Sequence, residues 1–550
     1  MSSAQSADTS TNWLSKERTI AGPGFSRWMV PPAALAIHLC IGMAYGFSVF
    51  WLPLSKSLGI TAAKTCGADV SLLAELFTTT CDWRISSMGW MYTLFFVVLG
   101  ISAAVWGGWL ERAGPRKAGV VAAICWGGGL IISAYGIHIH QLWLLWLGSG
   151  VIGGVGLGLG YISPVSTLIK WFPDRRGMAT GMAIMGFGGG AMIGSPLAAI
   201  LMKSFSTPTN VGVGQTFLVL GIIYFFFMMV GAMTYRVPPS GWKPEGWTPP
   251  VADPKKSMIT QHHVNVKKVW GIPQFWLIWI ALCMNVSAGI GVIGIASPML
   301  QEVFGGNLLG VSKTFGQLDQ SQLVSIGLIA AGFTALLSLF NIAGRFFWAS
   351  FSDKIGRKMT YVVFFVLGGV LYASIPASAG AGAQFLFVAA FCVILSMYGG
   401  AFATVPAYLA DIFGTQMVGA IHGRLLTAWS TAGIIGPVVI NYMREYQLGL
   451  GLPRSQVYNQ SMYILVIFLV IGLIANLMVK PLNPKWYMTP DELAEEKRLA
   501  HDRAVSNEVG SGSLKAGVTP NWLIVAAWLF VGIPLAWGIW RTSLSAARFF

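Results

Sequence analysis

Charged residues are scarce in this chain: Asp, Glu, Lys and Arg together make up 10% of its 550 residues. A soluble domain carries about 25%, so this chain has too few charges to cover the outside of several soluble cores. Hydrophobic residues make up 55%, and the mean hydropathy is +0.65. The composition excludes a soluble enzyme and a disordered scaffold. With only 6 cysteines, it also excludes a small secreted domain built from disulfides.

Several chemical motifs are also missing. The sequence has no cluster with metal-ligand spacing and no Walker motif, and its Gly-rich patterns lie inside apolar runs without a preceding strand. We therefore expect no cofactor, no bound metal and no enzymatic activity. The net charge of +15 does not indicate nucleic acid as a partner, because the basic residues lie in short loops between apolar runs.

Long apolar runs are what the chain does have. Each is close to the roughly 20 residues that a helix needs to cross a bilayer. They lie near 30–54, 86–110, 118–137, 142–169, 178–202, 214–236, 274–303, 323–351, 360–378, 383–411, 420–443, 459–480 and 521–540. The first run is too long for a signal peptide and no cleavage site follows it, so we expect a retained helix.

These runs predict an all-α membrane protein with two six-helix lobes and an extra, thirteenth helix. The predicted parts are a tail at 1–28, a lobe at 29–236, a linker at 237–273, a second lobe at 274–480, a tail at 481–520 and the extra helix at 521–540. Basic residues fix the predicted orientation, because cytoplasmic loops are enriched in Lys and Arg. The loops on the side of the linker hold most of them, which predicts a cytoplasmic N-terminus in a bacterial-type inner (plasma) membrane.

The two groups of six helices repeat each other. Glu111 and Asp353, Pro164 and Pro406, and Gly194 and Gly436 are all separated by the same number of residues. A repeated six-helix unit is typical of two-lobed transporters, whose substrate site lies between the lobes near the middle of the membrane.

One loop motif occurs in both halves. It reads Glu111-Arg112-Ala113-Gly114-Pro115-Arg116-Lys117 in the first half and Asp353-Lys354-Ile355-Gly356-Arg357-Lys358 in the second. The motif resembles the major facilitator superfamily, which implies that superfamily's fold. We expect the acidic and basic side chains to form a charge-paired contact between helices, here called the latch, which forms in one transport state and breaks in the other. The alternative is a loop that is basic only because it faces the cytoplasm. The candidate gating residues are Glu111, Arg112, Arg116, Asp353, Lys354 and Arg357.

A closer resemblance rests on four segments. They are Gly160-Tyr161-Ile162-Ser163-Pro164-Val165, Lys170-Trp171-Phe172-Pro173-Asp174-Arg175-Arg176-Gly177, Asp411-Ile412-Phe413-Gly414 and Thr427-Ala428-Trp429. They resemble the oxalate–formate antiporter family, a relative of the monocarboxylate transporters, which implies exchange or export of small carboxylates. The end of the chain, from Pro520, resembles a small one-helix subunit that accompanies some such transporters as a separate chain.

Arg345 is the clearest candidate for binding substrate. It lies inside the eighth apolar run, about 12 Å along the helix from Asp353, and a charge within a membrane span indicates function. Its counterpart in the first lobe is Ala103, so the arginine serves no purpose that both lobes share. A guanidinium can hold a carboxylate with two parallel hydrogen bonds, and the family resemblance implies the same role. The alternatives are a side chain that extends to the cytoplasmic surface or one that bonds backbone carbonyls.

Other residues complete the candidate substrate site. Arg424 is a possible second cation, against the alternative of an anchor at the cytoplasmic end. The resemblance implies that antiporters of dicarboxylates carry a lysine where this chain has Trp429, which favours a monocarboxylate. Tyrosines can hydrogen-bond an anion while their rings exclude water. The remaining candidates are Tyr45, Tyr161, Tyr398 and Trp429, each with the alternative of plain packing.

Four further residues bear on proton transfer and redox chemistry. Asn341 occupies the place where the resemblance implies a proton-carrying acid, and its amide cannot take up and release a proton. His38 is the one histidine deep in a span, where a packing role is favoured over a proton relay. Cys66 and Cys81 share a long loop outside the cytoplasm, which predicts a disulfide rather than two free thiols.

Together these observations predict a secondary active transporter of small organic anions that works by alternating access as a monomer. The substrate would be a monocarboxylate or an oxalate- or formate-like anion. Two alternatives are a proton-coupled monocarboxylate symporter and a membrane sensor that binds such anions without moving them. The short linker and tail disfavour the sensor, because neither has room for a signalling domain.

Overall fold

A computed structural model of the chain describes residues 13–14, 17–59, 64–67, 69–239, 242–246, 260, 262–414, 416–496, 498 and 518–547. Within these ranges it leaves out the side chains at 107–108, 110–112, 166, 169, 175–180 and 183. The described chain has 13 helical segments long and apolar enough to cross a membrane. The predicted fold class, an all-α membrane protein, is confirmed. Helices suit a bilayer because they satisfy every backbone N–H and C=O within one segment.

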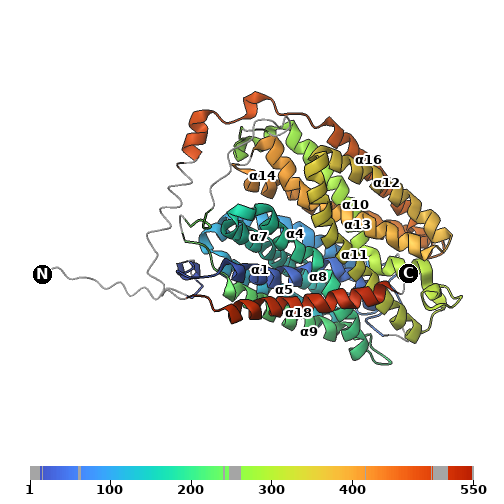
Figure 1. Cartoon of the computed structure of the whole chain (residues 1–550). Helices are drawn as coiled ribbons and strands as arrows, with labels where there is room; N and C mark the ends of the chain where they lie inside the picture. The colour runs from blue at the N-terminus through green and yellow to red at the C-terminus, as the bar shows by residue number, and fades with distance from the viewer. Residues whose placement is uncertain are drawn as a thin grey trace.

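The first lobe holds the helices before the linker (Figure 1). Its first span is built from α1 (Val30–Ile41), the 3-10 helix η3 (Gly42–Phe50) and α2 (Trp51–Leu54). Its fourth span is built from α6 (Leu142–Leu145), a π-helical stretch (Trp146–Gly153) and α7 (Gly154–Trp171). The other spans are α4 (Ile85–Ala113), α5 (Pro115–His138), α8 (Arg176–Phe205) and α9 (Val213–Thr234).

The second lobe follows the same order and lies beside the first (Figure 1). Its helices are α10 (Pro273–Phe304), α11 (Gln320–Ile355), α12 (Arg357–Gly380), α13 (Gln384–Phe413), α14 (Val418–Leu425) with α15 (Thr427–Gly449), and α16 (Asn459–Met478). The repeat extends to the turns, because Gly114 and Gly356 are related by the interval that relates Glu111 to Asp353. Both have positive φ, 85° and 88°, which glycine adopts without strain and which lets the chain turn sharply between two spans.

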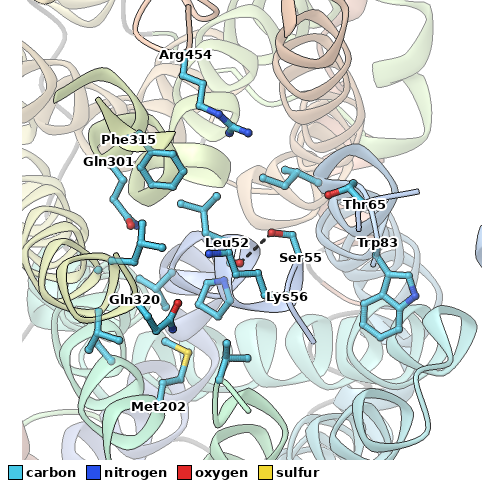
Figure 2. A pocket seen from close by; sticks show the side chains of 18 of the residues that line it. Leu52, Ser55, Lys56, Thr65, Trp83, Met202, Gln301, Phe315, Gln320 and Arg454 are labelled. Atoms are coloured by element: carbon cyan, nitrogen blue, oxygen red, sulfur yellow. Dashed lines mark hydrogen bonds between the residues drawn. The ribbon is translucent and has the colours of Figure 1, made fainter. Parts of the chain in front are cut away.

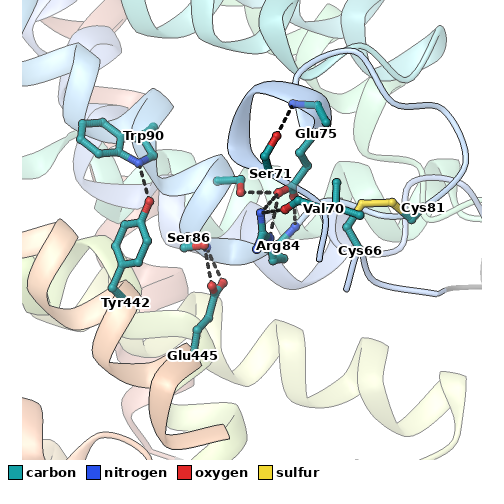
Figure 3. A network of polar contacts seen from close by, with 12 residues as sticks. Cys66, Val70, Ser71, Glu75, Cys81, Arg84, Ser86, Trp90, Tyr442 and Glu445 are labelled. Atoms are coloured by element: carbon teal, nitrogen blue, oxygen red, sulfur yellow. Dashed lines mark hydrogen bonds and ion pairs between the residues drawn. A yellow bond between two sulfur atoms is a disulfide. The ribbon is translucent and has the colours of Figure 1, made fainter. Parts of the chain in front are cut away.

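The two ends of the bundle differ. One end, here called the disulfide face, carries the loop between α2 and α4. Cys66 and Cys81 are bonded there with their Cα atoms 5.0 Å apart, which confirms the predicted bridge. Figure 3 shows the polar contacts beside it: the buried Glu75 carboxylate accepts hydrogen bonds from the Arg84 backbone N–H at 2.6 Å and from Nε at 2.8 Å. The opposite end, here called the linker face, carries the linker between α9 and α10.

Two pairs of helices join the lobes. Helix α8 packs on α11, where the Ser338 hydroxyl donates to the Gly188 carbonyl at 2.5 Å and accepts from the Met192 N–H at 3.1 Å. Helix α4 packs on α15, where the Ser430 hydroxyl donates to the Phe96 carbonyl at 3.0 Å. These contacts hold the lobes together across the middle of the bundle.

The thirteenth helix, α18 (Asn521–Ala546), runs along one edge of the bundle and touches both lobes (Figure 1). Its first half is held by the first lobe: Trp528 Nε1 donates to the Trp28 carbonyl at 3.2 Å, and Phe530 stacks on Phe227 with ring centroids 4.5 Å apart. Its last turns reach α11 of the second lobe, where Ser545 lies against Gly332. Most of its surface is exposed, as expected of a helix that faces lipid.

Candidate functional site

Arg345 lies on α11 and is 4% exposed. Its Nε donates to Asn341 Oδ1 at 3.0 Å, one helical turn away. Its Nη1 is buried and has no hydrogen-bond partner in the described part of the chain. Because buried polar atoms are nearly always bonded, an unpartnered guanidinium N–H indicates a place where an anion can bind.

The first lobe supplies the wall opposite this arginine. Gly188 of α8 lies so close that a Cβ on it would stand 3.1 Å from Arg345 Nε and 2.9 Å from Asn341 Oδ1. A side chain at position 188 would therefore push the guanidinium away. The glycine run of α8 lets the backbone of one lobe approach the charge of the other.

Seven aromatic side chains from both lobes surround this place, and we call them the aromatic cluster. They are Tyr45, Phe96, Tyr161, Phe187, Tyr398, Phe402 and Trp429. The Tyr45 and Tyr398 hydroxyls are 2.9 Å apart and join η3 of the first lobe to α13 of the second. The Phe402 ring centroid is 5.9 Å from Arg345 Cζ, so the cluster begins directly beside the guanidinium.

The four aromatic candidates from the sequence all belong to this cluster. Tyr161 lies 5.4 Å from Trp429 between ring centroids, and both are buried. The indole N–H of Trp429 has no hydrogen-bond partner among the described residues, which leaves a second buried donor in the cluster. The structure thus brings Arg345, Tyr45, Tyr161, Tyr398 and Trp429 together from positions far apart in the sequence.

The structure does not bring Arg424 to the same place. Its guanidinium bonds the Val266 carbonyl and lies 5.5 Å from the ring centroid of Trp270, both in the 3-10 helix η6 (Val266–Gly271) of the linker. The prediction that Arg424 is a second cation at the substrate site therefore does not hold in this arrangement. Arg424 instead fastens α14 to the linker, close to the alternative of an anchor at that end.

His38 lies in α1 beside the cluster and is completely buried. Its Nε2 is 3.1 Å from the Tyr161 carbonyl oxygen, and its ring stacks on Tyr161 with centroids 5.6 Å apart. These contacts match the packing role that the sequence favoured.

The candidate gating residues lie at the linker face, and the structure describes the second-lobe set best. Arg357 forms an ion pair with Asp353 and also lies 4.0 Å from an Asp411 carboxylate oxygen, so it links α11, α12 and α13. Lys354 has no ion pair or hydrogen bond within the described residues. The side chains of Glu111 and Arg112 fall outside the described ones.

Arg116 bonds backbone carbonyls at the same face. It donates to the Trp13 and Tyr235 carbonyls at 3.0 Å and 3.4 Å rather than to a described carboxylate. Lys358, its counterpart in the repeat, donates to the Leu477 carbonyl at 2.8 Å, and Tyr235 and Leu477 are themselves counterparts. In each lobe the basic side chain thus bonds free carbonyls where the sixth helix ends, at the negative end of the helix dipole.

A cavity of about 540 Å³ lies between the lobes near the disulfide face (Figure 2). Val49, one turn beyond Tyr45, is among its lining residues, and neither Arg345 nor any member of the aromatic cluster is. On the side of the linker face, α8 and α11 stay close, since a Cβ on Gly181 would lie 3.9 Å from the Phe346 ring. The cavity and the Arg345 site are therefore two separate places between the lobes.

Two repeated six-helix lobes that enclose a buried cation define a two-lobed membrane transporter. The sequence profile of the Major Facilitator Superfamily matches residues 35–437 and 308–548. The chain therefore belongs to the Major Facilitator Superfamily, and it is a multi-pass membrane transporter rather than an enzyme.

Similar proteins include carriers of carboxylates. The chain is 25% identical over 418 residues to the oxalate:formate antiporter of Oxalobacter formigenes, a match that covers 75% of this chain and 83% of that protein. It is 23% identical over 454 residues to apicoplast pyruvate carrier 1 of Toxoplasma gondii, covering 70% of this chain and 78% of that one.

A solved structure shares the fold. An inward-facing, occupied bacterial homolog of the human lysosomal transporter Spinster matches with a TM-score of 0.59 and 17% identity, covering 86% of this chain and 100% of that chain. At this identity the match shows the fold alone.

Proposed function

We propose that this chain is a secondary active transporter of small organic anions, with Arg345 as the residue that binds the carboxylate. One observation carries the proposal: a buried guanidinium with an unpartnered N–H faces an aromatic cluster built by both lobes. In such water-poor surroundings, paired hydrogen bonds from Arg to a carboxylate are strong. The names of the relatives, an oxalate:formate antiporter and a pyruvate carrier, support the same substrate class.

The charge of the site favours an anion with one carboxylate. Among the described lysines and arginines, Arg345 is the one in contact with the aromatic cluster, because Arg424 bonds the linker; Trp429 is neutral. A dicarboxylate bound there would keep one charge unpaired in a region of low dielectric, which is costly. Formate, acetate, lactate and pyruvate are therefore better candidates than oxalate.

The site also favours exchange over proton symport. The neighbour of Arg345 is the amide of Asn341, which cannot take up and release a proton, and His38 bonds the Tyr161 backbone. Exchange needs no proton carrier, because each transported anion is replaced by another. In the positive-inside orientation the linker face and the N-terminus lie in the cytoplasm of a bacterial-type cell, and the disulfide face lies outside.

Uptake into proteoliposomes tests the proposal. Purified protein is reconstituted with and without an internal carboxylate, and labelled formate, acetate, lactate, pyruvate and oxalate are added outside. We expect rapid uptake of at least one monocarboxylate that depends on the internal anion, without alkalinisation of a weakly buffered medium. Alkalinisation with uptake into empty vesicles would indicate the symporter, and binding without uptake would indicate the sensor.

A further inference from the structure

The cavity near the disulfide face has an unusual charge. Six charged residues line it: Lys56, Arg84, Lys203, Arg444, Glu445 and Arg454. Five of these side chains are basic and one is acidic. The cavity is therefore strongly positive unless the basic groups are neutralised by neighbours.

Two of the basic groups are paired with buried carboxylates. Arg84 forms an ion pair with the buried Glu75 at 2.6 Å. Arg444 forms an ion pair with Glu302, which is also completely buried. These two arginines help to shape the wall of the cavity and add little net charge.

The acidic residue bonds a serine rather than any of the remaining basic groups. Glu445 accepts hydrogen bonds from the Ser86 N–H at 2.8 Å and the Ser86 hydroxyl at 2.6 Å, where α15 meets α4 (Figure 3). No ion pair joins it to a described lysine or arginine.

Of the other three basic groups, two lysines are unpaired within the described chain and one arginine is only partly neutralised. The ammonium groups of Lys56 and Lys203 have no hydrogen bond or ion pair with any described residue. Arg454 shares Glu302 with Arg444, so one carboxylate serves two guanidinium groups. Figure 2 shows Arg454 extending into the pocket toward Lys56.

Lys56 and Arg454 act on each other as like charges. Burial lowers the pKa of Lys56, the Arg454 charge lowers it further, and Asp82 partly opposes both effects. Two positive charges that face one cavity repel, and an anion between them would turn repulsion into attraction.

We propose that this cavity is a second anion site, which binds the carboxylate of the transported class before it passes the aromatic cluster to reach Arg345. The site draws on Lys56, Lys203 and Arg454, and it rests on the proposed function for the identity of its ligand. A cavity of about 540 Å³ is much larger than a small carboxylate, so the anion is held loosely together with water. Such a site raises the local concentration of anions and the rate of capture more than the final affinity.

Binding to purified full-length protein tests the site apart from transport. The test uses the Arg345→Ala protein, which lacks the guanidinium of the first anion site. Its thermal unfolding midpoint is measured as a function of acetate concentration, at low and at high ionic strength. We expect weak, salt-sensitive stabilisation by acetate, because a ligand that binds only the folded state raises its stability. Adding Lys56→Gln or Lys203→Gln should weaken the apparent affinity by about threefold to tenfold, the effect of removing one partly screened charge. Lys56→Arg should preserve it.

Lys313→Gln is the matched control, because Lys313 lies on the same face, bonds Gln322 and does not line the cavity. In protein that still has Arg345, transport is compared between intact cells and inverted vesicles, which expose opposite faces to the added substrate. Lys56→Gln should raise the KM for uptake only in the preparation whose disulfide face meets that substrate, and it should leave kcat unchanged. If Lys56→Gln and Lys203→Gln both bind acetate like Lys313→Gln, the second site does not exist. If wild-type protein transports no carboxylate while acetate binding still depends on Lys56, the proposed function is wrong and the site stands.

Discussion

At the scale of single residues, the amide of Asn341 leaves the charge of Arg345 available to a ligand. Asn341→Asp would place a carboxylate against Arg345 Nε, where Asn341 Oδ1 now lies at 3.0 Å. The new ion pair competes with the substrate, so KM at neutral pH should rise by about tenfold, the equivalent of about 1.4 kcal/mol.

The same substitution should make uptake sensitive to pH. Protonation of the new carboxyl removes the like charge that opposes a substrate anion. Binding and protonation then favour each other, and uptake should increase as the pH falls. Asn341→Ser, which adds no charge, should lack this acid stimulation. A flat pH profile for both variants, measured by labelled uptake, would argue that Asn341 does not adjoin the bound anion.

The sequence predicted part of this site and missed the rest for physical reasons. The sequence alone predicted Arg345 as a site residue, because a charge within an apolar run is costly and therefore indicates function. Phe96, Phe187 and Phe402 gave no signal, because one phenylalanine in an apolar helix looks like any other. For Arg424 the sequence left two roles open, because its place near the end of a span does not reveal that a linker carbonyl lies beside it.

At the scale of helices, α18 connects the two lobes through a few close contacts. Gly332 of α11 meets Ser545, where a Cβ on the glycine would stand 2.4 Å from the Ser545 Cβ. Gly332→Ala should therefore displace the end of α18, and Gly327→Ala should not, because a Cβ at 327 meets nothing within 4 Å. We expect Gly332→Ala to lower the thermal unfolding midpoint, with transport per molecule preserved.

Removing α18 altogether should lower the stability of the protein more than Gly332→Ala does, again without loss of transport per molecule. A chain that ends at Ser513 loses the Trp528 and Phe530 contacts with the first lobe. We expect lower abundance in the membrane and normal uptake per molecule, because no residue of the helix adjoins Arg345 among the described contacts. A truncated protein that is abundant and inactive would show that α18 takes part in transport.

Helix ends show what the repeat could have predicted. The interval that relates Arg116 to Lys358 also relates Tyr235 to Leu477, so either cap contact, once known, predicts the other. The acidic residues of the loop motif predicted ion pairs rather than contacts with backbone carbonyls. Which carbonyls a helix end leaves free depends on how the neighbouring helices pack, and packing is not visible in a single sequence.

At the scale of the whole molecule, the two lobes lie close near the linker face and enclose a cavity near the disulfide face. Alternating access requires the close contact to open. A double variant, Gly181→Cys with Phe346→Cys, joined by a short bifunctional maleimide, would hold α8 against α11. We expect the cross-link to abolish exchange, and each single variant treated in the same way to retain it.

The cross-linked protein should still bind acetate at the cavity, because that cavity lies at the other end of the lobes. Stabilisation of the cross-linked protein by acetate, followed as the unfolding midpoint, checks this point. Normal exchange after complete cross-linking would mean that these helices do not separate during transport.

The architecture was more predictable than the site. Apolar runs of the right length indicated each span, and one constant interval between Glu111 and Asp353 and between Pro164 and Pro406 indicated two equivalent lobes. The cavity was not predictable, because its lining combines loop and helix ends from both lobes. Its open basic groups, Lys56 and Lys203, looked like ordinary loop residues in the sequence.

The central claim is that Arg345 binds the transported carboxylate through its two-pronged guanidinium. The most direct measurement is uptake of a labelled monocarboxylate by proteoliposomes that hold equal amounts of wild-type, Arg345→Ala and Arg345→Lys protein. Lysine keeps the charge and loses the paired hydrogen bonds, so both variants should insert normally and lose at least about 100-fold in uptake, the equivalent of about 2.7 kcal/mol. Near-normal uptake by the Arg345→Ala protein would contradict the account.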